Sequence, residues 1–411
     1  ESSRVSCYFA FLSPEWMIQW MLYIFWISVF LVGYTYLGYP LLLALFVKIK
    51  ERGQSVLPVT LKEWPTITLL IAAYNEKICL RAKLENSLAL DYPMDKLKIW
   101  IVTDGTTDDS NTLIQRYPTV QLFYQPERRG KLHAIQRVMP EVETEWVVFS
   151  DANAMLALDS LQRLMEAAIP QNVGVVAGEK RVYSGTNMAG GETIYWRYES
   201  WVKQWEGRFY SVTGTAGELY AIRTSLFTPV AEDSISDDLE IGWAVTEKGY
   251  TIAYAPAATS SETDIADAAL AYKRRVRVAT GSVQSAMRLM LGGKRNWPLA
   301  FWWEVISHRW LRAMVTPYCL FFILVSNLAL ISVHVFYSWC MAVQAVVYVC
   351  VFVDWYFSHR IFVSRLLIWP SFFVKAHLAM IKGAWDLLSG RGAVIWDPIP
   401  RDTNGDRGKN N

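Results

Sequence analysis

The chain has 411 residues, of which 53% are hydrophobic and 19% are charged, and its formal net charge is +2. Its 19 tryptophans and long uncharged runs make it too apolar for an ordinary soluble enzyme, and the small charge without a continuous basic block argues against nucleic-acid binding. The five cysteines lack CxxC spacing, so neither a zinc site nor a disulfide framework is implied. The composition predicts a soluble domain attached to membrane helices.

The first long apolar segment, residues 16–47, contains no charged residue, and about 20 apolar residues suffice to cross a bilayer. No A-x-A-like cleavage site accompanies it, so we expect a retained anchor. Lys48, Lys50 and Arg52 follow it closely, and the positive-inside rule therefore predicts that its carboxyl side is cytoplasmic.

From residue 65 to about residue 258, short apolar strands alternate with helical or loop stretches, which is typical of βαβ units and a mostly parallel sheet. We expect five strands, at 67–74, 97–104, 120–125, 146–151 and 173–178. Polar or acidic residues stand at the carboxyl ends of three of them: Asn75 and Glu76, then Asp104, then Asp151. Ligands of open α/β sheets gather outside the carboxyl ends of the strands, so these side chains should converge on one crevice.

The sequence WVVFSDAN, residues 146–153, places Asp151 and Asn153 at the end of a strand that is buried on both faces. Oxygens from both side chains could bind a hard divalent cation that carries a diphosphate. The alternative is that Asp151 only caps a helix from about Leu158 to Ala168. The pair alone does not decide between a metal site and a cap, but the motifs around it favour the metal site.

Seven motifs stand in the order found in membrane-bound family 2 glycosyltransferases: AAYNE (72–76), VTDGTTDDS (102–110), RRGKLHAIQ (128–136), SDAN (150–153), GTAGELYAIR (214–223), SDDLEIGWAVTEKGY (236–250) and RRVRVATG (274–281). Over about residues 65–281 the chain resembles the branch that contains hyaluronan, cellulose and poly-N-acetylglucosamine synthases. The resemblance implies an α/β domain of the GT-A type, a nucleotide-diphosphate sugar donor that is usually UDP-linked, and Mg²⁺ or Mn²⁺.

By this resemblance, Tyr74, Glu76 and Asp104 hold the uridine, and Lys131 contacts the diphosphate. Carboxylates can accept hydrogen bonds from uracil or ribose, and an ammonium group can pair with phosphate oxygens. Without the other motifs, Asp104 would be interpreted as an N-cap and Lys131 as a solvated charge. Asn153 departs from the commoner second Asp of the family's DxD, and its amide oxygen would coordinate a metal more weakly.

Glycosyl transfer to a hydroxyl group needs a base, and a positioned carboxylate is the usual one. Asp237 and Asp238 resemble the family's acidic pair, whose second member is the base, so the resemblance assigns that role to Asp238. The two acids could instead cap a helix from Leu239 to Lys248. A single displacement without an enzyme nucleophile implies inversion at the anomeric carbon.

RRVRVATG resembles the family's QxxRW segment, with Arg274 at the Gln position, Arg277 at the Arg position and Val278 at the Trp position. Arg277 can bind the leaving diphosphate through two parallel hydrogen bonds, and Arg274 is placed with it at the donor. The family's Trp stacks near the acceptor sugar, so Val278 puts the acceptor and processivity in question. RRVRVATG could also be part of a basic amphipathic helix that lies on anionic lipid, and this is compatible with a role in binding the diphosphate. The acceptor contacts expected from the GTAGE motif are Gly214, Thr215, Gly217 and Glu218.

Residues 193–210 include five aromatic side chains at near-helical spacing, Tyr195, Tyr198, Trp201, Trp205 and Phe209, which predict an interfacial helix. We interpret this helix as a membrane contact in preference to a sugar-stacking surface. Residues 313–353 lack Asp, Glu, Lys and Arg, enough for two spans with a turn near 334–338. Residues 361–388 contain basic side chains and could be re-entrant, interfacial or a fourth span.

We therefore expect an extracytoplasmic segment (1–15), a transmembrane helix (16–47), a cytosolic GT-A domain (48–296), an interface helix with two spans and a further membrane segment (297–388), and a basic tail (389–411). The expected function is an inverting glycosyltransferase in a bacterial inner or plasma membrane that lengthens an extracellular polysaccharide. The alternative is a non-processive enzyme that glycosylates a polyprenyl phosphate or another lipid. A scaffold with a degenerate domain would be expected to have lost Asp151 or Asp238, and both are present.

Overall fold

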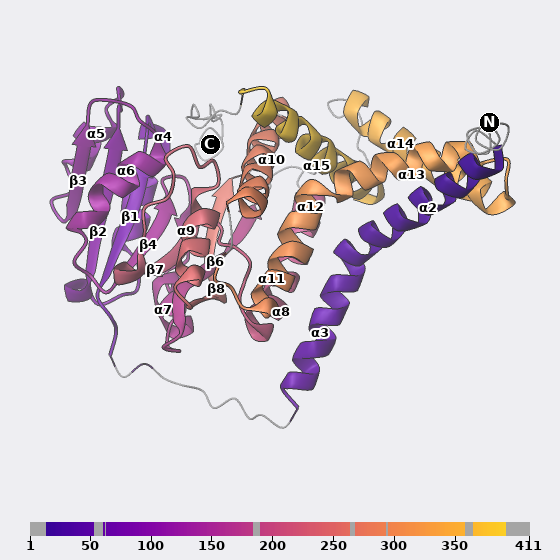
Figure 1. Cartoon of the computed structure of the whole chain (residues 1–411). Coiled ribbons are helices and arrows are strands. Elements are labelled where there is room, and N and C mark those ends of the chain that lie inside the picture. Colours follow the sequence, from indigo (N-terminus) through magenta and orange to yellow (C-terminus); the bar gives the residue numbers. More distant parts are fainter. Residues whose placement is uncertain are drawn as a thin grey trace, which may run out of the picture.

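The computed structural model describes residues 14–52, 61, 63–183, 190–263, 268–292, 295–357 and 365–391. Figure 1 shows a sheet with its covering helices at one side of the molecule and a group of long helices at the other. Helices α8 (Gly190–Phe209), α10 (Ala268–Leu291) and α15 (Arg365–Leu388) lie between the two parts.

The sheet has eight strands in the order β3-β2-β1-β4-β7-β6-β8-β5. The parallel half consists of β1 (Ile67–Ala73), β2 (Leu97–Asp104), β3 (Val120–Gln125) and β4 (Trp146–Asp151). Strand β7 (Leu219–Arg223) is antiparallel to both β4 and β6 (Val173–Tyr183), β8 (Thr251–Thr263) is parallel to β6, and β5 (Met155–Leu156) is antiparallel to β8. All five strands predicted from the sequence are present, and β5, β7 and β8 are additional.

Strand β1 (ITLLIAA) is apolar almost throughout because it lies at the centre of the parallel half with helices against both of its faces. Successive side chains of a strand point to opposite faces. Leu69 therefore packs in one core with Leu80 of α4 (Lys77–Leu88), and Leu70 packs in the other with Leu132 of α6 (Lys131–Val138). Helices α5 (Ser110–Ile114) and α7 (Ser160–Ala167) lie against the first core, and α9 (Asp237–Glu247) against the second.

The anchor predicted at 16–47 is a continuous helical segment made of α2 (Pro14–Gly33), a π-helical turn (Tyr34–Gly38) and α3 (Tyr39–Lys50). Residues 15–50 are long and apolar enough to cross a membrane, and so is most of α14 (Val335–Phe357). Residues 299–314 comprise α11 (Leu299–Val305), a π-helical turn (Ile306–Trp310) and α12 (Leu311–Met314). If this segment and α13 (Thr316–Leu330) together form one span bent by 53°, the described residues contain a third candidate span.

Helix α15 covers most of residues 361–388, the segment whose topology the sequence leaves open. It is not one of the helices of the described residues that are long and apolar enough to span a membrane. It packs along α10 so closely that a Cβ atom added to Gly383 would lie 2.7 Å from the backbone nitrogen of Thr280. Lys375 of α15 pairs with Asp354 of α14 at 2.5 Å. These contacts hold α15 against both α10 and α14.

Candidate active site

The loops that follow β1 and β2 are tied together by Asn75. Its backbone adopts the left-handed conformation, with φ 51°, and its Oδ1 accepts hydrogen bonds from the backbone nitrogens of Thr107 (2.8 Å) and Asp108 (3.3 Å). Asn is one of the few non-glycine residues that tolerates this conformation readily. The convergence of strand ends predicted from the sequence is therefore present, and here Asn75 holds it.

Asp104 ends β2 and fixes the start of α6. Its Oδ2 accepts hydrogen bonds from the backbone nitrogens of Arg129 (2.9 Å) and Gly130 (2.5 Å). Its Oδ1 is buried and has no hydrogen-bond partner among the described residues. Because a buried carboxylate oxygen without a partner is costly, this atom is poised to accept a hydrogen bond from a ligand.

Tyr74 and Glu76, which the resemblance places at the uridine, lie at the end of β1. The Arg128 guanidinium group lies 3.9 Å from the centroid of the Tyr74 ring. Gly105, in the loop after β2, has a φ of +65°, and a Cβ atom at this position would lie 2.6 Å from Cβ of Arg128. Because Gly105 has no side chain, Arg128 can approach this loop closely. The Glu76 carboxylate accepts a hydrogen bond from Sγ of Cys79 at 3.0 Å.

Lys131 and Asp151 bring the start of α6 and the end of β4 together. Nζ of Lys131, at the first turn of α6, lies 2.6 Å from Oδ1 of Asp151 at the end of β4. Burial alone would lower the pKa of Lys131, but Asp151, Asp237 and Asp238 outweigh burial and raise it above its usual range. Lys131 is therefore a fixed positive charge among acids. Helix α7 begins at Ser160 with Asp159 at its N-cap position, so Asp151 does not cap it.

Asp237 and Asp238 occupy the first turn of α9, where a helix dipole favours negative charge. Burial, followed by the neighbouring Asp237, raises the pKa of Asp238 to about 7, while Lys131 opposes the rise and Glu218 adds to it. A carboxyl group whose pKa lies near neutrality is suited to general-base catalysis. The helix begins at Asp237, with Ser236 at its N-cap position, so the alternative in which the two acids cap a helix from Leu239 is wrong.

The four residues expected to contact the acceptor lie in the loop that enters β7. Oγ1 of Thr215 donates to the backbone oxygen of Asp238 at 2.9 Å, and a Cβ atom added to Gly217 would lie 3.7 Å from the Asp238 carboxyl group. Gly214 lies against Leu239, where a Cβ atom would approach within 2.6 Å. The loop therefore follows the start of α9 closely, and Glu218 contributes to the electrostatic environment of Asp238.

Arg277 and Arg274 reach the site from α10. Burial and Arg274 lower the pKa of Arg277, and Asp237, Asp151 and Asp238 oppose that shift, so Arg277 shares the electrostatic environment of the three acids. Nη2 of Arg274 lies 3.0 Å from Glu262 and 3.5 Å from Glu218.

Sequence reasoning missed two members of this cluster, Lys180 of β6 and Glu262 of β8. Lys180 pairs with Glu262 at 2.8 Å and also contacts Glu218. Burial alone would raise the pKa of Glu262, but Lys180 and Arg274 outweigh burial and hold it below its usual range. For Lys180 the available signal was a charged residue shortly after the apolar run 173–178, whereas Glu262 lies in the polar half of β8 and gives no such signal.

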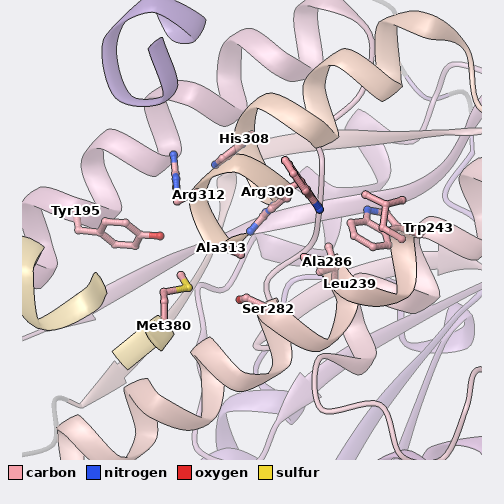
Figure 2. A pocket seen from close by; sticks show the side chains of 12 residues that line it. Tyr195, Leu239, Trp243, Ser282, Ala286, His308, Arg309, Arg312, Ala313 and Met380 are labelled. Atoms are coloured by element: carbon pink, nitrogen blue, oxygen red, sulfur yellow. The ribbon is translucent and has the colours of Figure 1, made fainter. Parts of the chain in front are cut away.

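A small cavity of about 50 Å³ lies where the sheet domain meets the long helices (Figure 2). Its walls come from α8, α9, α10, α12 and α15, and Figure 2 shows Tyr195, Arg309 and Met380 around it. None of the residues expected to bind the donor lines it. A space of this size holds a few water molecules and not a sugar.

A model of the family described as glycosyltransferase-like family 2 matches residues 65–281. The poly-beta-1,6-N-acetyl-D-glucosamine synthase of Staphylococcus aureus (strain COL) is 26% identical over 239 residues, which cover 56% of this chain and 58% of that protein. The probable glycosyltransferase YdaM of Bacillus subtilis (strain 168) is 23% identical over 246 residues, with the same two shares. The chain thus spans somewhat more than half the length of these relatives.

Among solved structures, the mannosyltransferase PcManGT from Pyrobaculum calidifontis, in complex with GDP-Man and Mn²⁺, superposes with a TM-score of 0.69 at 21% identity. The match covers 90% of this chain and 99% of that one. Together with the mixed sheet and its covering helices, it confirms the expected GT-A-type fold, with apolar helices flanking the domain.

Proposed function

The chain belongs to glycosyltransferase family 2, and on that premise we propose that it transfers a sugar from a nucleotide-diphosphate donor to a growing polysaccharide. In this proposal the donor binds at the carboxyl ends of β1, β2 and β4, and the transfer inverts the anomeric configuration. The observation that carries the proposal is the half-buried Asp238, whose pKa is raised to about 7 within the electrostatic reach of Lys131. A base for the acceptor and a cation for the diphosphate are thereby present in one crevice.

The donor half of the site fits a nucleotide. The unpartnered Oδ1 of Asp104 can accept from a ribose hydroxyl group or a base nitrogen, and Tyr74 directly follows β1, the strand that pairs with β2. Lys131 and Arg277 carry the positive charge that a diphosphate needs, and both are fixed at helix positions near Asp151. We assign UDP as the nucleotide on the resemblance of the motifs.

A divalent cation fits the residues present. The described part of the chain has no group of three or more His, Cys, Asp or Glu that could hold a metal ion by itself. Mg²⁺ and Mn²⁺ are commonly held by one or two protein oxygens, with phosphates and water completing the shell, and Asp151 and Asn153 would supply two. When bound, the ion neutralises charge that develops on the leaving diphosphate.

The remaining chemistry belongs to the protein. Asp238 accepts the proton of the acceptor hydroxyl group as its oxygen attacks the anomeric carbon, and the bond from that carbon to the diphosphate breaks. Lys131 and Arg277 stabilise the departing diphosphate by charge and hydrogen bonds. One displacement inverts the anomeric configuration.

Two features favour a lipid acceptor as the second candidate. Val278 replaces the tryptophan of the family's motif, and only two or three helices in the described residues could span a membrane. In that case the enzyme adds one sugar to a polyprenyl phosphate or another lipid and releases it.

The test is to incubate the purified protein with Mn²⁺ and a panel of labelled nucleotide sugars, in detergent and in lipid vesicles, and to determine the size of the product. A polymer formed from a UDP-sugar, and abolished in Asp238→Asn, is expected. A product that carries a single sugar on lipid would favour the second candidate. Absence of transfer from every donor would contradict the proposal.

A further inference from the structure

Asn153, the residue that departs from the family's DxD pattern, is held by a buried acid from a distant strand. Its amide nitrogen Nδ2 donates to Oε1 of Glu262 at 3.1 Å, and the Glu262 residue is only 3% exposed. The two residues are 109 positions apart in the sequence. Their contact is therefore a product of the fold and not of local chain geometry.

The backbone fixes this pairing. Directly after Asn153, strand β5 pairs antiparallel with β8, and Met155 lies opposite Ser261, the neighbour of Glu262. The turn that carries Asp151 and Asn153 is thereby attached to the strand that carries Glu262. Neither side chain needs a large movement to keep its partner.

Glu262 can only accept at this contact. Its Oε2 lies 2.8 Å from Nζ of Lys180 and 3.0 Å from Nη2 of Arg274, so two cations face the carboxylate. An ionised carboxylate has no proton to donate. The planar amide of Asn153 must therefore present Nδ2 to Glu262, and its oxygen Oδ1 is turned away from Glu262.

We propose that Glu262 is a positioning residue that orients the Asn153 amide so that Oδ1 is available to the cation, and that it is the reason why position 153 holds Asn. A carboxylate side chain at position 153 would lie within hydrogen-bond distance of the Glu262 carboxylate, and like charges at that distance repel. The inference rests on the proposed function for the identity of the ligand, a divalent cation with a nucleoside diphosphate.

The test is a cycle of Asn153→Asp, Glu262→Gln and the double variant, with Mn²⁺ affinity measured in the presence of UDP by the EPR signal of free Mn²⁺. Asn153→Asp should weaken Mn²⁺ binding at least about tenfold, as losses of partners around a metal ligand commonly do. Glu262→Gln alone should also weaken Mn²⁺ binding, because the Gln oxygen is needed to accept from Lys180 and Arg274. Its nitrogen then faces Asn153, so the Asn153 oxygen is no longer held toward the cation. In the double variant the Gln nitrogen can donate to the carboxylate introduced at position 153, and the affinity should recover to near that of the original protein.

Asn153→Asp that binds Mn²⁺ as tightly as the original protein, or a double variant that is no better than Asn153→Asp, would overturn the inference. Glu179→Gln is the matched control. Glu179 lies on β6 next to Lys180 but bonds Tyr254 and Ser200, so its replacement should not rescue Asn153→Asp.

A second measurement separates this inference from the proposed function. The hydrogen bond between Asn153 and Glu262 joins two side chains of the protein itself, so the melting temperature in EDTA should fall in Asn153→Asp and recover in the double variant. If Asp151→Ala leaves Mn²⁺ binding unchanged, the metal site of the proposed function is wrong. The melting temperatures in EDTA would still support or overturn the coupling of residues 153 and 262.

Discussion

At the scale of single residues, burial and Asp237 raise the pKa of Asp238, the base that we propose, to about 7. Only the ionised form can accept the acceptor proton, so kcat/KM should fall by about tenfold per pH unit below about pH 7. Asp238→Asn should retain donor binding and slow transfer by roughly 10² to 10⁴. A pH profile, with UDP binding measured in parallel, checks this, and near-normal turnover would move the role to Asp237 or Glu218.

The same shift predicts an effect on stability. The pKa of Asp238 in the folded protein is above its usual value, so its contribution to stability is fully present at low pH and is lost as pH rises through about 7. An Asn at this position stays neutral. Asp238→Asn should therefore have a higher melting temperature than the original protein at pH 8 and no such advantage at pH 4.

Lys131 has two competing partners. It is paired with Asp151 at 2.6 Å, the carboxylate that we assign to the metal, and we propose that it also binds the diphosphate. Lys131→Met should therefore raise the affinity for Mn²⁺ alone and lower the affinity for a UDP-sugar. Titrations of Mn²⁺ without nucleotide and of UDP with Mn²⁺ measure the two effects, and a fall in both affinities would contradict the assignment of Asp151.

At the scale of helices, one buried histidine connects α8 to the segment between α11 and α12. Nδ1 of His308 lies 2.6 Å from Glu206 and Nε2 lies 2.9 Å from Glu199, and Arg312 pairs with Glu199 at 2.7 Å. The hydroxyl group of Tyr39 in α3 also donates to Glu206, at 2.8 Å. The two acids are seven positions apart and share a helix face.

His308→Ala should destabilise the protein by about 3–5 kcal/mol, because it leaves buried carboxylates without their shared partner. Tyr39→Phe, which removes one hydrogen bond, should cost about 1 kcal/mol. Glu166→Gln, which breaks a surface pair with Arg163, is the control and should change stability by less than about 1 kcal/mol. Denaturation of the purified protein in detergent compares the three, and equal losses would contradict the importance of the histidine.

The elements also show what sequence reasoning can reach. The parallel strands were predictable because each is a near-continuous apolar run, and the acids were predictable because each directly follows such a run. Strand β8 (TIAYAPAATSSET) has a polar second half, and β5 has only two residues, so neither gives a strand pattern. Glu262 and His308 acquire their roles from partners 82 and 102 positions away, and no local pattern reports such contacts.

At the scale of the whole molecule, large apolar side chains on α2 and α14 remain exposed, among them Tyr23, Phe30, Trp339 and Phe352. An apolar surface of this extent on helices long enough to cross a bilayer is expected to face lipid. Lys48 and Lys50 lie in the last turn of α3, so we expect the sheet domain to be cytoplasmic. A reporter fused near Gln54 should give a cytoplasmic signal, and an extracytoplasmic signal would reverse the topology.

The length of the product depends on how the acceptor is held, and Val278 is the position to test. Val278 is 53% exposed on α10, so a larger side chain can be accommodated there. Two tryptophans that follow α10 in the sequence are packed on other rings: Trp297 on Phe301 with ring centroids 4.9 Å apart, and Trp303 on Tyr39 at 5.1 Å. Replacing them should therefore lower stability and not act on the acceptor alone.

An aromatic platform at position 278 would contribute about 0.5–1.5 kcal/mol to holding a sugar, if it behaves as other aromatic contacts do. At about 1.4 kcal/mol per tenfold in affinity, this prolongs the residence of the acceptor several-fold. Val278→Trp should therefore lengthen the polymer, and Val278→Leu, which adds bulk without an aromatic face, should not. Gel sizing of labelled product at equal turnover measures the difference. Equal lengths in all three proteins would show that the acceptor is held away from α10, and a single added sugar in each would identify the enzyme as the lipid-glycosylating type.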